Sequence, residues 1–181
     1  LDPSQLHDRL GYWLFKQMGV PAPRAIHAKL YINGIYNGLF SLVEQIDEQF
    51  ADYHFSDGTG NIYKEVWPLK SNGHVQSDKK FYKALVTNQT HGVNNNIIKS
   101  FAEQIVNAND TEIKAVIKDY MEVNQMLSYA VVDRTIRHDD GPFHWYCDWG
   151  QCEPHNFFWY ENPSTGKIHL IPWDLDNAFE N

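Results

Sequence analysis

The sequence contains no run of about 20 consecutive apolar residues, so no segment is predicted to cross a membrane as a helix. It has no excess of Lys and Arg: the formal net charge is -8 and the pI is 5.5, which argues against non-specific nucleic-acid binding and against an anionic membrane surface. It also lacks internal repeats, low-complexity tracts, a Walker A motif and a G-x-G-x-x-G loop. A nucleotide can still bind such an acidic chain if a divalent cation neutralises its phosphates.

Cysteine is scarce, because only Cys147 and Cys152 occur, in CDWGQC. Their spacing suits either a small disulfide loop, as in exported proteins, or two reduced thiols, and a metal site would need two further ligands. The chain begins at Leu1 without an initiator Met or signal peptide and stops after Asn181, so we expect a fragment truncated at both ends. The lack of a targeting signal is therefore uninformative.

The composition that is present is that of a folded chain. Hydrophobic residues make up 43% and aromatic residues 14% of the 181 residues. This length is sufficient for one domain with its own core, which we assign to residues 1–181. The excess of aromatic residues predicts a dense core and is also typical of grooves that bind sugars, bases or peptides.

Turn signals and strand alternation predict two antiparallel hairpins. The first covers residues 25–47, with its turn at Asn33-Gly34 and a bulge at Asn37-Gly38. The second joins residues 156–161 to residues 167–174 across the turn sequence NPSTGK.

A helical middle separates the hairpins, so the predicted fold class is α+β. One helix is expected to start near residue 78, and others to cover residues 96–107, 110–118 and 121–140. A further helix is expected at the start of the chain, ending before Gly19. The predicted buried stripe of the first helix is Leu6, Leu10, Trp13, Leu14 and Met18, and that of the long helix is Val123, Met126, Leu127, Ala130 and Val131.

The last apolar strand, LIPWD, ends in two closely spaced carboxylates. Alternate residues of a strand share a face, so Asp174 and Asp176 are predicted to point into one cleft. Mg²⁺ prefers oxygen ligands and takes one or two protein carboxylates together with phosphates. In an isolated Asp-x-Asp motif, a turn-capping or solvated role is the commoner alternative.

Two further motifs complete an order found in phosphoryl-transfer enzymes. RHDDG places Asp139 and Asp140 at the end of the long helix, where acids oppose the helix dipole and serve either a function or a simple cap. Asn156 opens the strand that pairs with the last one. Kinase-type enzymes use an acid to take the hydroxyl proton, then an Asn and an Asp to hold Mg²⁺. The corresponding order here is Asp140, Asn156, Asp174.

The chain resembles the spore coat protein H (CotH) kinase family through most of its length. The resemblance rests on four motifs in order: LYINGIYNGLFSLVEQID, GNIYK, DRTIRHDDG and HNFFWYENPSTGKIHLIPWDLDNAF. It implies a divergent protein-kinase-like fold that transfers phosphate from ATP, with Mg²⁺, to Ser or Thr of a protein substrate. It also implies an extracellular location or one at a cell or spore surface. The sequence departs from the family pattern at Arg137-His138-Asp139, where Asn is usual.

The resemblance also implies roles for individual residues. Asp140 matches the catalytic acid, with Asp139 as the alternative register. Asp174 matches the metal-binding Asp, with Asp176 in support, and Asn156 matches the family's Asn.

Two charged residues in the first half of the chain, Lys64 and Glu44, match family positions as well. A Lys–Glu pair that orients nucleotide phosphates would suit a kinase.

Two other functions are open at this point. A nucleotide-sugar glycosyltransferase would use Asp174-Leu175-Asp176 as its metal motif, and it predicts a parallel sheet ahead of that motif. A carbohydrate- or protein-binding module predicts sugar binding that needs no metal or nucleotide. Its aromatic platform would be Trp145, Tyr146, Trp149 and Trp159.

Overall fold

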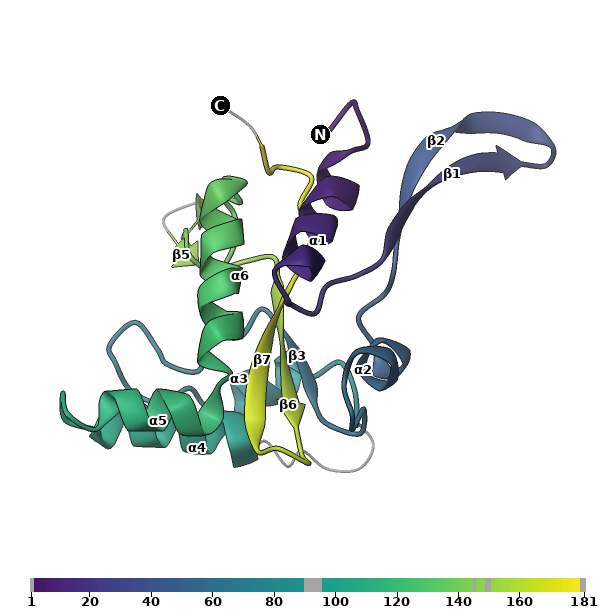
Figure 1. Cartoon of the computed structure of the whole chain (residues 1–181). Coiled ribbons are helices and arrows are strands. Elements are labelled where there is room, and N and C mark those ends of the chain that lie inside the picture. The colour runs from purple at the N-terminus through teal and green to yellow at the C-terminus, as the bar shows by residue number, and fades with distance from the viewer. Residues whose placement is uncertain (1, 90–95, 145, 149–150, 180–181) are drawn as a thin grey trace.

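The structure is a computed structural model that describes residues 2–89, 96–144, 146–148 and 151–179. Helices and strands alternate irregularly along the chain, as the α+β prediction requires (Figure 1). The described helices are α1 (His7–Gln17), α2 (Glu48–His54), α3 (Asp78–Ala84), α4 (Asn96–Asn107), α5 (Ile113–Tyr120) and α6 (Val123–Thr135). The described strands are β1 (Ala25–Ile32), β2 (Ile35–Val43), β3 (Ile62–Lys64), β4 (Tyr146–Asp148), β5 (Gln151–Glu153), β6 (Phe157–Asn162) and β7 (Lys167–Pro172).

A three-stranded sheet with the order β3-β6-β7 forms the centre of the molecule. The predicted second hairpin is β6–β7, in which Phe157 lies opposite Pro172 and Asn162 opposite Lys167. Every strand pair in the described residues is antiparallel. The described chain therefore offers no parallel sheet of the kind that the glycosyltransferase alternative predicts.

Strand β6 is buried on both faces because a hydrophobic core lies on each side of it. Phe157 and Trp159 pack into the larger core with residues of α1, α3, α4 and α6. Phe158 and Tyr160 pack into the smaller core with residues of α2. Such burial on both faces fixes the register of the hairpin, and with it the position of the hairpin's open end.

The predicted buried stripes of two helices are wrong. In α1 the buried residues are Gly11, Tyr12 and Phe15, whereas Leu6, Leu10, Trp13 and Met18 are exposed and Leu14 is partly buried. In α6 the buried residues are Tyr129, Val132 and Asp133, whereas Val123, Leu127 and Val131 are exposed and the predicted Met126 and Ala130 are partly buried. Both helices carry apolar residues on more than one face, and the aromatic residues, which bury the larger area, face the sheet.

The β1–β2 hairpin projects from the rest of the molecule (Figure 1). Its register shifts between Leu30 and Tyr31, because Leu30 pairs with Gly38 while Tyr31 pairs with Tyr36. Asn37 is therefore the extra residue, which confirms the predicted bulge.

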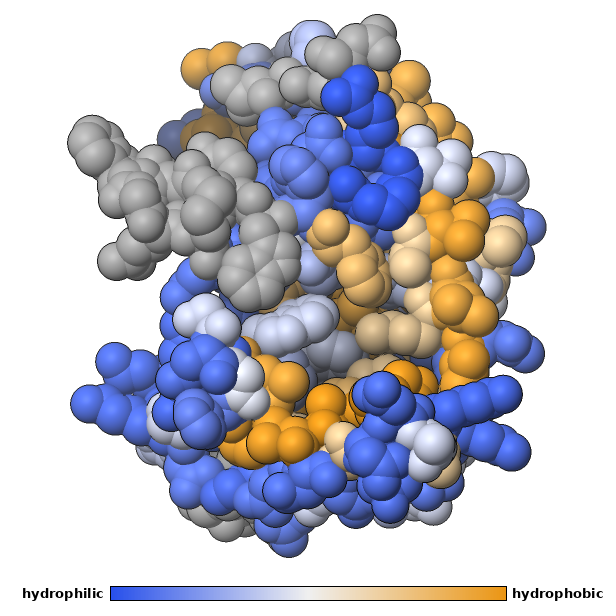
Figure 2. Space-filling view, turned by 90° about the vertical axis from the view of Figure 1, so that its left-hand side faces the viewer, coloured by the Kyte–Doolittle hydropathy of each residue, from blue (hydrophilic) through white to orange (hydrophobic). Residues whose placement is uncertain are grey.

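The side of the molecule that carries α5, α6 and β5 is hollowed, with hydrophobic residues in the hollow and hydrophilic residues around it (Figure 2). Among the described helices, none has the length and apolar character needed to cross a membrane.

Candidate active site

The open end of the β6–β7 hairpin brings Asn156 and Asp174 together. Asn156 is the residue before β6, and Asp174 is the second residue after β7. The Trp173 N–H donates to the Asn156 carbonyl oxygen at 3.1 Å. Both residues have left-handed backbones, with φ values of 57° for Asn156 and 48° for Asp174. Asn and Asp tolerate this conformation better than other side chains, but it is a sparsely populated one that recurs at functional sites.

Helix α1 holds the backbone of residues 174–176 in place. The Tyr12 hydroxyl accepts from the Asp174 N–H at 3.0 Å, and Asp8 Oδ1 accepts from the Leu175 N–H at 3.1 Å. His7 Nδ1 lies 2.8 Å from the Asp176 carbonyl oxygen. The sequence predicted only a core role for α1, because contacts across more than 160 residues leave no local pattern.

Gly11 makes the close approach of α1 to this segment possible. A Cβ atom at Gly11 would lie 2.5 Å from Leu175 Cδ1. A larger residue would therefore force the buried Leu175 side chain to move.

His138 connects the end of α6 to the same segment. Its side chain is fully buried, with Nδ1 3.1 Å from Asp133 Oδ1 and Nε2 3.2 Å from the Asp174 carbonyl oxygen. The same Nε2 lies 3.5 Å from Asp140 Oδ1. His138 is thus a positioning residue that sets Asp140 beside Asp174, at a point where the sequence departs from the family pattern.

The two adjacent acids of the RHDDG motif differ in their surroundings. Asp139 forms ion pairs with Arg134 at 3.3 Å and with Arg137 at 3.5 Å, and its side chain is 45% exposed. Asp140 Oδ2 accepts from Asn177 Nδ2 at 3.1 Å, whereas its buried Oδ1 has no hydrogen-bond partner in the described part of the chain. This arrangement favours Asp140 as the reactive acid, because the charge of Asp139 is already compensated.

Negative charge is concentrated around Asp174. Although Asp174 is exposed to solvent, partial burial of its carboxylate together with the charges of Asp176, Asp8 and Asp140 raises its pKa to about 6. The pKa of Asp8 is raised as well, chiefly by burial and secondarily by Asp176. Among the described residues, no Lys or Arg forms an ion pair with any of these four carboxylates.

This charge distribution fits a divalent cation. No group of three or more His, Cys, Asp and Glu in the described chain is arranged to hold a metal ion by itself. Mg²⁺ does not require such a cage, because it binds through one or two carboxylates, with waters and substrate phosphates as its other ligands. Asp174 and Asp176 are two neighbouring carboxylates of this kind, and the Asn156 backbone is joined to Trp173 beside them.

Lys64 lies near Asn156, whereas Glu44 belongs to a different cluster. The Lys64 ammonium lies 4.0 Å from Glu65 Oε1, and this same oxygen accepts from the Asn156 N–H at 3.2 Å. Glu44 accepts from the Arg24 guanidinium and backbone and lies 3.5 Å from His54 Nε2. The described residues therefore contain no Lys64–Glu44 ion pair, and Lys64 instead neighbours Glu65.

The aromatic platform of the binding-module alternative is not formed as expected. Trp159 is 1% exposed and belongs to the core. Trp145, Trp149 and the side chain of Tyr146 lie outside the described residues. The backbone of Cys147 lies opposite Cys152 in the β4–β5 pair, but their side chains, and hence the choice between a disulfide and two thiols, lie outside the described residues.

Asp140 follows α6, Asn156 precedes β6 and Asp174 follows β7, and partial burial with the charges of Asp176, Asp8 and Asp140 raises the pKa of Asp174. The family described as CotH kinase protein matches residues 1–181, and the chain belongs to this family, as its motifs predicted. No curated protein matches the sequence.

Proposed function

We propose that this chain transfers a phosphoryl group from ATP to a Ser or Thr hydroxyl of a protein substrate, in a reaction that depends on Mg²⁺. Membership of the CotH kinase family supports the reaction class. The clustering of the Asp140, Asp174 and Asp176 carboxylates, with the Asn156 backbone joined to Trp173 beside them, is the observation that supports the proposed assignment of residues. The proposal includes a divergent kinase-like arrangement of the catalytic elements.

Asp140 is the catalytic acid in this proposal. Its carboxylate accepts the proton of the substrate hydroxyl while the hydroxyl oxygen bonds to the γ-phosphorus and the bond from that phosphorus to the leaving ADP oxygen breaks. Asn177 Nδ2 donates to Oδ2 of Asp140 at 3.1 Å, and His138 Nε2 lies 3.5 Å from Oδ1 without a hydrogen bond, so the carboxylate is oriented chiefly by Asn177. Catalysis of this kind relies mainly on positioning.

Asp174, Asp176 and Asn156 hold Mg²⁺ in this proposal. The bound ion would neutralise phosphate charge on the nucleotide. Tyr12 and His7 contact the backbone of Asp174 and Asp176, and Asp8 that of Leu175 between them, so α1 as well as the hairpin positions the proposed ligands.

Lys64 is the proposed contact to the nucleotide phosphates, because it is the cation next to the Glu65–Asn156 contact. Glu44 is proposed to have a structural role away from the nucleotide: it holds Arg24 and His54 in place at the base of the first hairpin.

Calorimetric titration of ATP with and without Mg²⁺ tests the nucleotide site. The wild-type chain is compared with Asp174→Ala and with Asp139→Ala, a matched loss of one carboxylate from the neighbouring ion-paired position. We expect Mg²⁺-dependent binding by the wild type and by Asp139→Ala, and loss of binding in Asp174→Ala. ATP binding that is equal with and without Mg²⁺, or that survives Asp174→Ala, would contradict the proposed site.

Transfer of labelled γ-phosphate to a panel of Ser- and Thr-containing proteins tests the reaction. Phosphoamino-acid analysis of the labelled product identifies the acceptor residue. ATP hydrolysis without protein labelling, or label on another residue type, would refute the acceptor part of the proposal while leaving the nucleotide site intact.

A further inference from the structure

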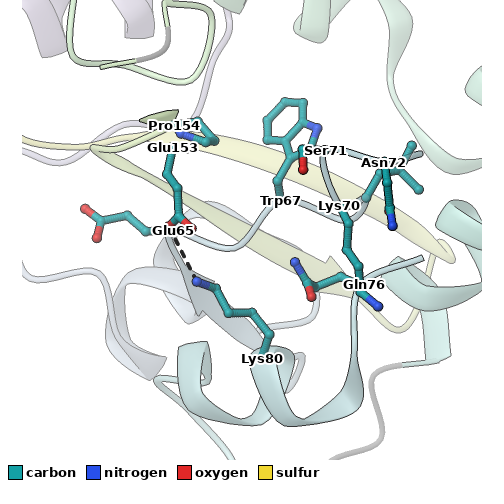
Figure 3. A pocket seen from close by; sticks show the side chains of 10 residues that line it. Glu65, Trp67, Lys70, Ser71, Asn72, Gln76, Lys80, Glu153 and Pro154 are labelled. Carbon is teal, nitrogen blue, oxygen red and sulfur yellow. Dashed lines mark hydrogen bonds and ion pairs between the residues drawn. The ribbon is translucent and has the colours of Figure 1, made fainter. Parts of the chain in front are cut away.

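A cavity of about 370 Å³ adjoins the candidate active site and is not used by the proposed reaction. Its walls come from the segment after β3, from the start of α3 and from the residues just before Asn156 (Figure 3). Glu65 joins the two sites, because it lines the cavity while its Oε1 accepts from the Asn156 N–H at 3.2 Å.

The segment that lines most of the cavity has a fixed backbone. Leu69 and Val75 form a β-bridge, the Lys70 N–H donates to the His74 carbonyl at 2.8 Å, and the Gln76 N–H donates to the Pro68 carbonyl at 2.9 Å. The cavity is therefore formed in the absence of a ligand, which keeps the entropic cost of binding low.

The side chains in this segment are also held in place. Asn72 Oδ1 accepts from the His74 N–H at 3.2 Å, and Gln76 Oε1 accepts from the Ser77 N–H at 2.9 Å. Trp67 is a partly buried wall of the cavity, and its ring contacts the rings of Phe157 and Trp159 at centroid distances of 5.9 Å and 5.8 Å. The indole is thus a rigid apolar surface with part of its area left for a ligand.

Charge in the cavity is balanced. Two cations, Lys70 and Lys80, and two carboxylates, Glu65 and Glu153, line it, and Lys80 lies 3.5 Å from Glu153 (Figure 3). A strongly anionic or cationic ligand would meet groups of its own sign on one wall. A neutral ligand with many hydroxyl groups would instead find donors and acceptors on every wall.

We propose that this cavity binds a sugar residue, of the size and neutral polyhydroxylated character of a hexose or an N-acetylhexosamine. The C–H face of the sugar packs on Trp67, and its hydroxyl groups bond to the amides and to the two ion-pair partners. A triphosphate is disfavoured here because Glu65 and Glu153 would face it. The site thus gives the chain a glycan-recognition function that is independent of phosphoryl transfer.

The position of the sugar beside Asn156 has a functional consequence. Glu65 lines the cavity and accepts from the backbone N–H of the candidate metal ligand, so a glycan in the cavity would lie next to Asn156. A glycosylated or cell-wall-attached substrate would be held by its sugar.

Saturation-transfer NMR with glucose, N-acetylglucosamine and their short oligomers tests this site in the absence of ATP and Mg²⁺. We expect binding by the wild type, and about tenfold weaker binding by Trp67→Ala through loss of the stacking surface. Trp13→Ala is the matched control, because Trp13 is an exposed indole on α1 outside this cavity. Gln76→Ala, at a partly exposed polar wall, separates loss of binding from loss of packing around Trp67.

Three outcomes would overturn the proposal. One is that no saccharide binds the wild type, and another is that Trp13→Ala weakens binding as much as Trp67→Ala. The third is that adenosine displaces the sugar, which would make the cavity part of the nucleotide site. None of these outcomes depends on kinase activity, so the sugar site and the proposed reaction fail separately.

Discussion

Replacing Asp174 with Asn should stabilise the metal-free protein at neutral pH. The pKa of Asp174 is raised from 3.8 to about 6, so the folded state binds this proton more tightly than the unfolded chain does. Stability is then highest below pH 4 as far as this group is concerned, and it falls as the pH rises from about 4 to about 6. Above pH 6 the ionised carboxylate opposes folding in full.

The magnitude follows from the same pKa values. A change from 3.8 to about 6 corresponds to about 3 kcal/mol if the interaction is unscreened. Asp174 is exposed, so solvent screening reduces this to about 1 kcal/mol. For a chain of this size, about 1 kcal/mol raises Tm by about 3 °C. Asn tolerates the left-handed backbone at this position, so the substitution adds little strain.

Differential scanning calorimetry between pH 4 and pH 8, in the presence of a chelator, measures this effect. The Tm of Asp174→Asn should exceed that of the wild type at pH 7 and approach it near pH 4. Asp139→Asn should show the opposite sign or no change, because it removes ion pairs with Arg134 and Arg137. Added Mg²⁺ should stabilise the wild type more than Asp174→Asn.

The reasoning would be refuted if Asp174→Asn melts below the wild type at pH 7, or if the difference between the two is independent of pH. Either result would mean that the carboxylate is stabilised in the fold by a partner, and that the four acids do not form a repulsive cluster.

Three further predictions concern the catalytic acid, the anchoring of the Asp174 backbone and a buried carboxylate of β6. Asp140→Asn should reduce the rate of phosphoryl transfer by about 10²- to 10⁴-fold while ATP binding persists. An equal loss in the neighbouring Asp139→Asn variant would contradict the assignment of Asp140 as the catalytic acid in preference to Asp139. Tyr12→Phe removes the acceptor for the Asp174 N–H, so it should lower the free energy of unfolding measured in urea by about 1 kcal/mol and weaken Mg²⁺ binding. If both values are unchanged, α1 does not position the proposed site. Glu161→Ala should lower the free energy of unfolding by about 3 kcal/mol, because the three hydrogen bonds that Glu161 accepts from buried donors would be lost. A loss below about 1 kcal/mol would show that water takes the place of the carboxylate.

The two hairpins, and with them the proximity of Asn156 and Asp174 at the open end of β6–β7, could be predicted because their signals are local. Asn33-Gly34 and NPSTGK are turn sequences, and an alternating or continuous apolar strand on each side sets the pairing. Once the second hairpin is paired, Asn156 and Asp174 must meet at its open end. The proximity of Asn156 and Asp174 could therefore be predicted from the sequence alone.

The helix faces could not be predicted in the same way. Periodicity identifies an apolar stripe, but α1 and α6 carry more than one, and only the position of the sheet selects the buried one. The hydroxyl of Tyr12 and the carboxylate of Asp8 bond to the backbone of Asp174 and Leu175, which is a contact that no local pattern encodes. The Lys64–Glu44 pairing failed for a related reason, because Arg24 lies directly beside Glu44 at the base of the first hairpin and takes its carboxylate.

The candidate site differs from its surroundings in whether its carboxylates have cationic partners. Glu44 and Asp139 each bond to Arg, and buried Asp133 bonds to Arg134, so these carboxylates are compensated by the protein itself. The segment at residues 174–176 is instead held by backbone hydrogen bonds to α1 and His138, which fix its position without neutralising its charge. A segment that served only as a turn would be more stable with neutral side chains there. The combination of a fixed backbone with uncompensated carboxylates is the observation that supports the proposed Mg²⁺ site.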